Sequence, residues 1–159
     1  MELEFDVQMN AGVLYDYYIY HIYRSAAGII GTIVGLIMMA SFVKLHNPIY
    51  LVCGAIIVLY LPLNLFLTSR RQAATIPVYK EPIHYKLNSE GISISQNESN
   101  GTHEWDVVKK AVSTGKSIIL YTSKNTATIF PREALGDDVS LAIQIICANV
   151  DPKKVKIKC

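Results

Sequence analysis

Side chains that commonly carry out catalysis or bind metals are few in this chain and lie far apart in the sequence. The four histidines are His21, His46, His84 and His103. They stand without a set of cysteines or carboxylates at metal-ligand spacing, which argues against a zinc site. Neither a phosphate-binding glycine loop nor a Gly-x-Ser-x-Gly motif is present. We therefore expect no catalytic residue, no cofactor and no metal site, and we predict that the protein is not an enzyme.

The remaining candidates for function are basic residues, which are suited to bind a protein or a negatively charged surface. Lys109, Lys110 and Lys116 flank a predicted turn, and Trp105 and Tyr121 lie on strands that we expect to leave them exposed. Near an anionic membrane each Lys or Arg adds about 1 kcal/mol of attraction. We predict that these five residues form the contact surface for a protein partner or for lipid. A solvated edge is the alternative.

A second basic cluster lies in the tail, residues 151–159, whose sequence is DPKKVKIKC. The same attraction would hold this tail against a membrane, and a frayed, solvated terminus is the alternative that the sequence leaves open. The net charge is only +2, and basic residues are not interleaved with aromatic ones. Nucleic acid is therefore not an expected partner.

Two apolar runs must position these residues. Residues 25–43 and 49–67 each extend for 19 residues without an ionisable group, in a chain that is 51% hydrophobic and 18% charged. At about 1.5 Å per residue, each run is long enough to cross a hydrocarbon layer of about 30 Å. Core helices of a soluble protein would show a polar face at helical spacing, and neither run has one. We predict a transmembrane helical hairpin over residues 25–67, with a turn at 44–48.

The charges that flank the hairpin predict its orientation. Arg24 precedes the first span, Arg70 and Arg71 follow the second, and the turn contains Lys44 alone. Positive residues accumulate on the cytoplasmic side of membrane proteins. We therefore expect a cell-membrane protein with two spans and with both termini in the cytoplasm.

Small and polar residues within the spans predict how the two helices meet. Gly31 and Gly35 form a Gly-x-x-x-Gly pair, which favours close packing of helices and also leaves a homodimer open. Pro62 predicts a kink, and Asn64 needs a hydrogen-bond partner in lipid, which we expect on the neighbouring helix. A substrate or ion site around these two residues is the alternative, although the spans contain no carboxylate, Lys or Arg.

The segment before the hairpin, residues 1–24, combines two patterns. Residues 3–9 alternate apolar and polar side chains as a half-buried strand does, and Asn10 is suited to cap a helix over residues 11–24. Five tyrosines in that helix favour a position at the inner leaflet, because the ring is apolar and the hydroxyl group is polar. An aromatic ligand site is the alternative.

After the hairpin, the sequence changes to that of a small globular domain. A linker with two prolines covers residues 68–82, and short alternating runs separated by turn residues follow from residue 83. A helix that ends at Val150, with Asp137 or Asp138 as its cap, closes this domain. We predict an α+β protein in which residues 83–150 form a small antiparallel half-barrel capped by a C-terminal helix, joined by the strand at 3–9.

The segments PVYKEPIHYKLNSEGISIS and HEWDVVKKAVSTGKSIILYTSKNTATIFPREAL carry a resemblance to a known family. With the order of the parts, they resemble the bacterial YcxB-like family. Trp105, the strand that ends at Tyr121 and the Phe130-Pro131-Arg132 sequence are the features concerned. The resemblance implies two membrane spans followed by a cytoplasmic domain similar to pleckstrin-homology (PH) domains. It implies no catalytic residue.

Three functions remain as hypotheses. The first is a non-enzymatic membrane protein whose PH-like module binds a protein partner at the inner face, through a sheet edge or strand loops. The second is an immunity protein that protects its cell against a membrane-active bacteriocin or toxin, a hypothesis based on fold analogy alone. The third is an enzyme or transporter of a lipid intermediate, which the absence of internal repeats disfavours.

Overall fold

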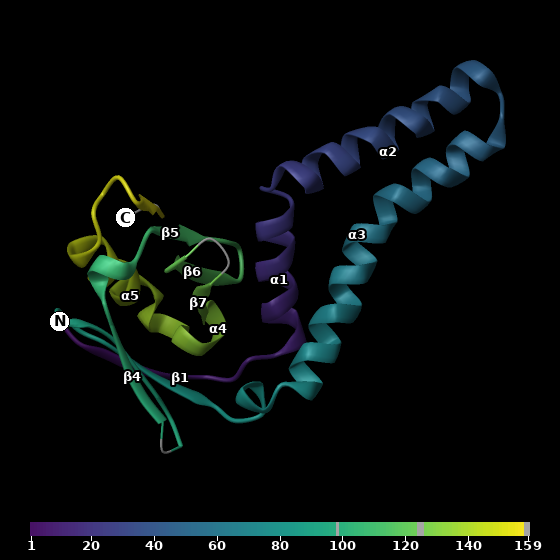
Figure 1. Ribbon diagram of the computed structural model, residues 1–159. Helices are drawn as coiled ribbons and strands as arrows, with labels where there is room; N and C mark the ends of the chain where they lie inside the picture. The colour runs from purple at the N-terminus through teal and green to yellow at the C-terminus, as the bar shows by residue number, and fades with distance from the viewer. Residues whose placement is uncertain (98, 124–125, 158–159) are drawn as a thin grey trace.

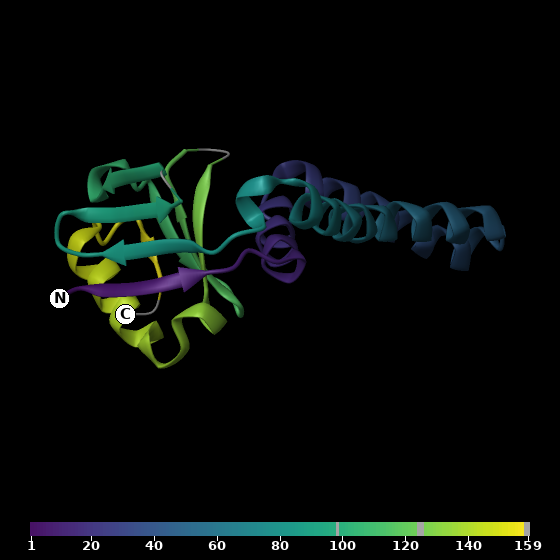
Figure 2. The ribbon, with the colours of Figure 1, turned by 90° about the horizontal axis from the view of Figure 1, so that it is seen from below.

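The computed structural model describes residues 1–97, 99–123 and 126–157, and it consists of a long helical hairpin attached to a mixed head (Figure 1). The predicted α+β class is confirmed, since two long apolar helices are accompanied by mainly antiparallel sheets and a C-terminal helix. The N-terminus lies in the head, on the side away from the hairpin (Figures 1 and 2). The predicted tail residues 158 and 159 lie outside the described residues.

The hairpin consists of α2 (Ala26–Leu45) and α3 (Pro48–Thr75). The Ser25 hydroxyl group accepts a hydrogen bond from the Gly28 N–H, and Asn47 caps α3 through the Ile49 N–H at 3.0 Å. His46 ends α2 in the left-handed conformation, with φ of 53°. Both helices are long and apolar enough to cross a membrane, and only 11% of the most apolar window of each is buried. Core helices of a soluble protein would be mostly buried, so this surface is compatible with a membrane protein.

The second helix is longer than predicted. It continues to Thr75, so more than half of the expected linker 68–82 is helical, and only the short η1 helix (Pro77–Tyr79) and an irregular stretch follow. The physical reason is that no proline interrupts the sequence between Pro62 and Pro77. The helix also accommodates Pro62 in its interior.

Helix α1 (Ala11–Ile22) packs against the last turns of α3. Asn10 caps α1 as predicted, because its side chain accepts a hydrogen bond from the Val13 N–H at 2.9 Å. The Tyr15 ring meets the Phe66 ring edge-on at 5.8 Å. The Tyr18 hydroxyl group donates a hydrogen bond to the Gln72 side chain. The tyrosines of α1 therefore join the head to the hairpin, a role that the sequence did not indicate.

The head contains two four-stranded sheets whose strands cross one another in Figure 2. The first sheet is antiparallel throughout and follows the chain order β1 (Leu3–Val7), β2 (Ile83–Leu87), β3 (Gly91–Gln96) and β4 (Ser99–Glu104). The second has the order β7 (Ala127–Pro131), β6 (Ser117–Tyr121), β5 (Lys110–Ser113) and β8 (Val155–Lys156). The η2 helix (Trp105–Val107) connects the two sheets. The helices α4 (Arg132–Leu135), η3 (Gly136–Asp138) and α5 (Val139–Asn149) follow β7.

The core of the head lies between the sheets and α5. Alternation places Leu3, Phe5 and Val7 of β1 inward, and the ring of Phe5 meets Phe130 edge-on at 5.3 Å. Every residue of β6 is buried, as expected for a strand covered on both faces. Helix α5 adds Ala142, Ile145 and Ile146 to the same cluster. The N-terminal strand thus joins the domain as predicted, by pairing with β2.

Two strands of the second sheet, β5 and β8, are not identified by alternation of apolar and polar side chains. Strand β5 has four residues, too few to show a clear alternation. Part of the predicted tail forms β8, which pairs in parallel with β5 and so is not frayed over its described residues. Pairing between segments this distant depends on the tertiary fold. Asp138 precedes α5, but among the described residues its side chain makes no capping hydrogen bond.

Candidate interaction surfaces

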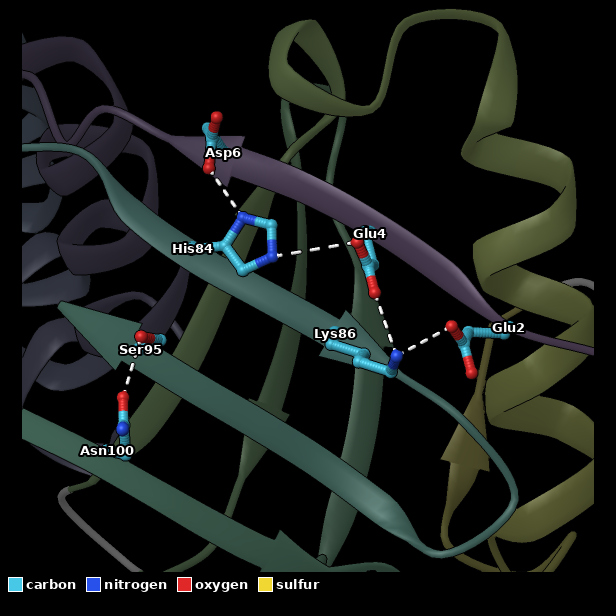
Figure 3. A network of polar contacts seen from close by, with 7 residues as sticks. All are labelled: Glu2, Glu4, Asp6, His84, Lys86, Ser95 and Asn100. Atoms are coloured by element: carbon cyan, nitrogen blue, oxygen red, sulfur yellow. Dashed lines mark hydrogen bonds and ion pairs between the residues drawn. The ribbon is translucent and has the colours of Figure 1, made fainter.

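The outer face of the first sheet is polar and carries a network of charges (Figure 3). Register places Glu4 opposite Lys86 and Asp6 opposite His84. The Lys86 ammonium group lies 2.8 Å from a Glu4 carboxylate oxygen, and His84 Nδ1 lies 2.8 Å from Asp6 Oδ1. Hydrogen bonding to Lys86 lowers the pKa of Glu4. The carboxylates are exposed and their partners His84 and Lys86 are only half-buried, so we expect these ion pairs to contribute little to stability. The described residues contain no cluster of potential metal ligands.

The edge strand β4 is the most open part of this sheet. All six of its residues are exposed, and it pairs only with β3. One cross-strand contact, from the Ser95 hydroxyl group to the Asn100 side chain at 2.7 Å, stabilises that pairing (Figure 3). The opposite side of the strand leaves a row of backbone N–H and C=O groups without a partner strand. Natural proteins usually protect such edges with prolines, lysines or bulges, and β4 contains neither proline nor lysine.

The two aromatic residues predicted to make contacts are buried. Trp105 is 6% exposed and donates a hydrogen bond from its indole to the Asn88 carbonyl at 2.9 Å. Tyr121 is 8% exposed and packs beside Tyr17 and His21 of α1. Their predicted exposure is therefore wrong. Trp105 begins the η2 turn that carries the chain from one sheet to the other, and this turn directs the ring into the core.

The three predicted lysines do not form one surface. Lys110 lies opposite Tyr121 at one end of the β5–β6 hairpin, whereas Lys116 lies in the turn at its other end. Lys116 instead neighbours Arg132, with which it lines a different pocket. Lys109 and Lys116 are exposed, and Lys110 is half-buried. In an antiparallel hairpin the turn lies at one end and the outer ends of both strands lie at the other. Lys110 and Lys116 are therefore close in the sequence but lie at opposite ends of the hairpin.

The residues singled out in the helical hairpin also lie on different faces. Gly35 and Gly54 lie against each other across the helix pair, and a Cβ atom on Gly54 would lie 2.7 Å from the Gly35 carbonyl oxygen. Gly31 has more room, since its nearest neighbour, a Leu61 methyl group, would be at 3.9 Å. Asn64 is exposed on α3 and lines an apolar groove made by α3 residues alone. The expected partner for Asn64 on α2 is not found among the described residues.

The three arginines that predicted the orientation lie near the head. Arg24 stands between α1 and α2 with its guanidinium group 4.7 Å from the centre of the Tyr20 ring. Arg70 and Arg71 lie in the part of α3 that continues beyond the second apolar run, and Arg70 lies 5.7 Å from the ring of Phe66. Lys44 is at the opposite end of the hairpin, in the last turn of α2.

Comparison with known proteins matches part of the head to a family model. The family model described as YcxB-like protein matches residues 87–146, which run from the end of β2 into α5. Neither the search of curated proteins nor that of solved structures gave a match. The match leaves out the hairpin, α1 and β1. The resemblance seen in the sequence is confirmed over the matched stretch, since residues 87–146 match the YcxB-like family model.

Proposed function

We propose that this protein is a two-span membrane protein whose head binds a protein partner at the inner face of the membrane by adding a strand to β4. The proposed role is non-catalytic. The membrane location is supported by the two apolar helices and their exposed surfaces. The inner-face placement is supported by Arg24, Arg70 and Arg71 at the head end of the hairpin. The PH-like description of the head rests on the family resemblance.

The open edge of β4 carries the proposal. Its six exposed residues present backbone donors and acceptors to which an extended peptide can pair, and main-chain hydrogen bonds supply affinity in this type of recognition. The other edge of the sheet, β1, has carboxylates at Glu4 and Asp6 and lies beside the α4 helix. Among the described residues no feature favours the immunity hypothesis or the lipid-intermediate hypothesis over this one.

Photo-crosslinking in cells tests the proposal. A photoreactive phenylalanine analogue at Thr102 on β4 should give a discrete protein adduct, and the same analogue at Ser140, an exposed position on α5, should not.

Backbone N–H groups alternate between the two sides of a strand, so either Asn100 or Gly101 donates toward the open side. Proline at that position removes the donor without breaking a backbone hydrogen bond to β3, and Asn100→Pro also removes the exposed side-chain bond from Ser95.

The proline variants Asn100→Pro and Gly101→Pro are compared first by thermal unfolding. The variant that keeps the wild-type Tm is the informative one, and it should lose the Thr102 adduct. An adduct that persists in this variant, or an equal adduct at Ser140, would contradict strand addition at β4.

A further inference from the structure

A small pocket of about 280 Å³ lies where the head, α1 and α2 meet. Its lining residues come from three parts of the chain: Tyr20, His21, Arg24, Ser25, Lys110 and Tyr121. Arg24 and Ser25 connect α1 to the first apolar helix, whereas Lys110 and Tyr121 are paired residues of β5 and β6. The volume is just below the usual range for ligand sites, which suits a small polar group better than a large molecule.

The pocket concentrates positive charge without a neutralising carboxylate. Among the described residues, neither Arg24 nor Lys110 forms an ion pair with an acidic side chain. Their cationic groups lie over aromatic rings instead, Arg24 at 4.7 Å from the Tyr20 ring centre and Lys110 at 5.8 Å from that of Tyr121. Burial, followed by the charges of Lys156 and Arg24, lowers the pKa of Lys110. Cations held close together in this way attract an anion.

Strand β8 extends this positive region. Its pairing with β5 brings Lys156 opposite Val112, close enough for its charge to act on Lys110. Lys110 and Lys156, which are 46 residues apart in the sequence, therefore lie close enough for their charges to interact. The pocket adjoins the start of α2, because Ser25 is among its lining residues.

The position of the pocket specifies the source of the anion. Ser25 is the N-cap of α2, so the pocket begins at the first residue of an apolar span. In a membrane this residue lies at the level of the lipid headgroups. Large apolar side chains of α2, among them Ile29, Ile30 and Ile33, are exposed directly beyond it. A lipid whose phosphate occupies the pocket would therefore find an apolar surface for its acyl chains.

We propose that this pocket binds the phosphate group of an anionic phospholipid of the inner leaflet. Arg24 and Lys110 donate hydrogen bonds to the phosphate oxygens, and the acyl chains lie along α2. This places one specific lipid beside the head and holds the head at a set distance from the membrane. The proposal rests on the membrane placement of the hairpin given above, and it is independent of the β4 edge.

Thermal unfolding of the full chain in non-ionic detergent tests the proposal. Added phosphatidylglycerol should raise the Tm, because a ligand that binds only the folded state stabilises it, and phosphatidylcholine should not. Lys110→Gln should require about five-fold more phosphatidylglycerol for the same increase, the change expected for the loss of one charge near the headgroup. Lys109→Gln is the matched control, since it removes the same charge from an exposed neighbouring position outside the pocket.

Any one of three results would overturn the proposal. Equal effects of Lys109→Gln and Lys110→Gln would show general surface attraction instead of a site. Equal stabilisation by the two lipids would exclude selection for a net negative headgroup. If inorganic phosphate raises the Tm as phosphatidylglycerol does, the ligand is soluble phosphate and the lipid assignment is wrong. Arg24→Gln provides a second test if Lys110→Gln does not fold. The result of the Thr102 crosslinking experiment has no bearing on these outcomes. Failure of strand addition at β4 therefore leaves the lipid proposal standing, and failure of lipid binding leaves strand addition standing.

Discussion

Tyrosines make many of the contacts that hold the parts of this protein together. Tyr85 is buried between Phe5, whose ring centre lies 5.8 Å away, and Phe130 at 5.1 Å. Tyr121 joins β6 to Tyr17 of α1 at 6.2 Å. Burial raises the pKa of Tyr85 and of Tyr121 to about 12, because the phenolate form would have to lose its hydration. At the residue scale, these side chains therefore function as neutral packing groups.

The raised pKa of Tyr85 predicts a loss of stability in alkali. A tyrosine in the unfolded chain ionises near pH 10, whereas folded Tyr85 keeps its proton up to about pH 12. The unfolded state therefore loses protons first, and the free energy of unfolding falls as the pH rises from 10 to 12. Tyr85→Phe keeps the ring contacts and should flatten this decrease. Denaturant unfolding in detergent at pH 9, 10 and 11 measures the slopes, and an unchanged slope in the variant would contradict the assignment.

At the scale of elements, the close approach of α2 and α3 depends on two glycines that face each other. A Cβ atom on Gly54 would lie 2.6 Å from the Met39 side chain and 2.8 Å from the Met39 nitrogen atom. Backbone atoms cannot move aside as a flexible side chain can, so the helices would have to separate. Such close approach allows packing and backbone contact in a membrane, where the hydrophobic effect does not drive helices together.

Substitution of these glycines should have unequal effects. Gly54→Ala should destabilise the helix pair by about 1–3 kcal/mol, the usual effect of overpacking. Gly31→Ala is the matched control, because its Cβ atom would have only an ordinary contact at 3.9 Å. Alanine also favours a helix more than glycine does, so this control should be neutral or slightly stabilising. Thermal unfolding of the solubilised protein compares them, and equal losses of stability would show that the glycine contact is unimportant.

At the scale of the molecule, α1 fixes the head relative to the hairpin. One side of α1 meets α3 through Tyr15 and Tyr18, and another meets the head through Tyr17 and Asp16. Asp16 accepts a hydrogen bond from the Thr114 hydroxyl group at 2.6 Å. Both ends of the hairpin thus enter the head through packed helices, since α3 itself extends to Thr75. The head and the hairpin form one structure in which the pocket at Arg24 adjoins the start of α2.

The orientation in the membrane gives a prediction at this scale. With the native cysteines replaced by serine, His46→Cys in the hairpin turn should react with a membrane-impermeant maleimide on intact cells, and Thr102→Cys on β4 should not. The reason is the excess of arginine at the head end, against Lys44 alone at the turn. Permeabilised cells should label both positions. Labelling of Thr102→Cys on intact cells would place the head outside and remove the basis of both proposals.

The sequence by itself determined the parts of this protein whose signal is local. Span length and apolarity identified the hairpin, alternation of side chains identified β1, β2 and β3, and Asn10 marked the start of α1. These patterns depend on residues within one turn or one strand, so they can be recognised without knowledge of the fold.

Only the tertiary structure decided which of these parts meet. It buried Trp105 and Tyr121, separated Lys116 from Lys110, and brought Lys110 beside Arg24, which is 86 residues earlier in the chain. It also formed β8 from part of the basic tail. The physical reason is that such contacts arise when distant segments share a core. The free energy that favours them comes from burial of both partners, which neither segment shows alone.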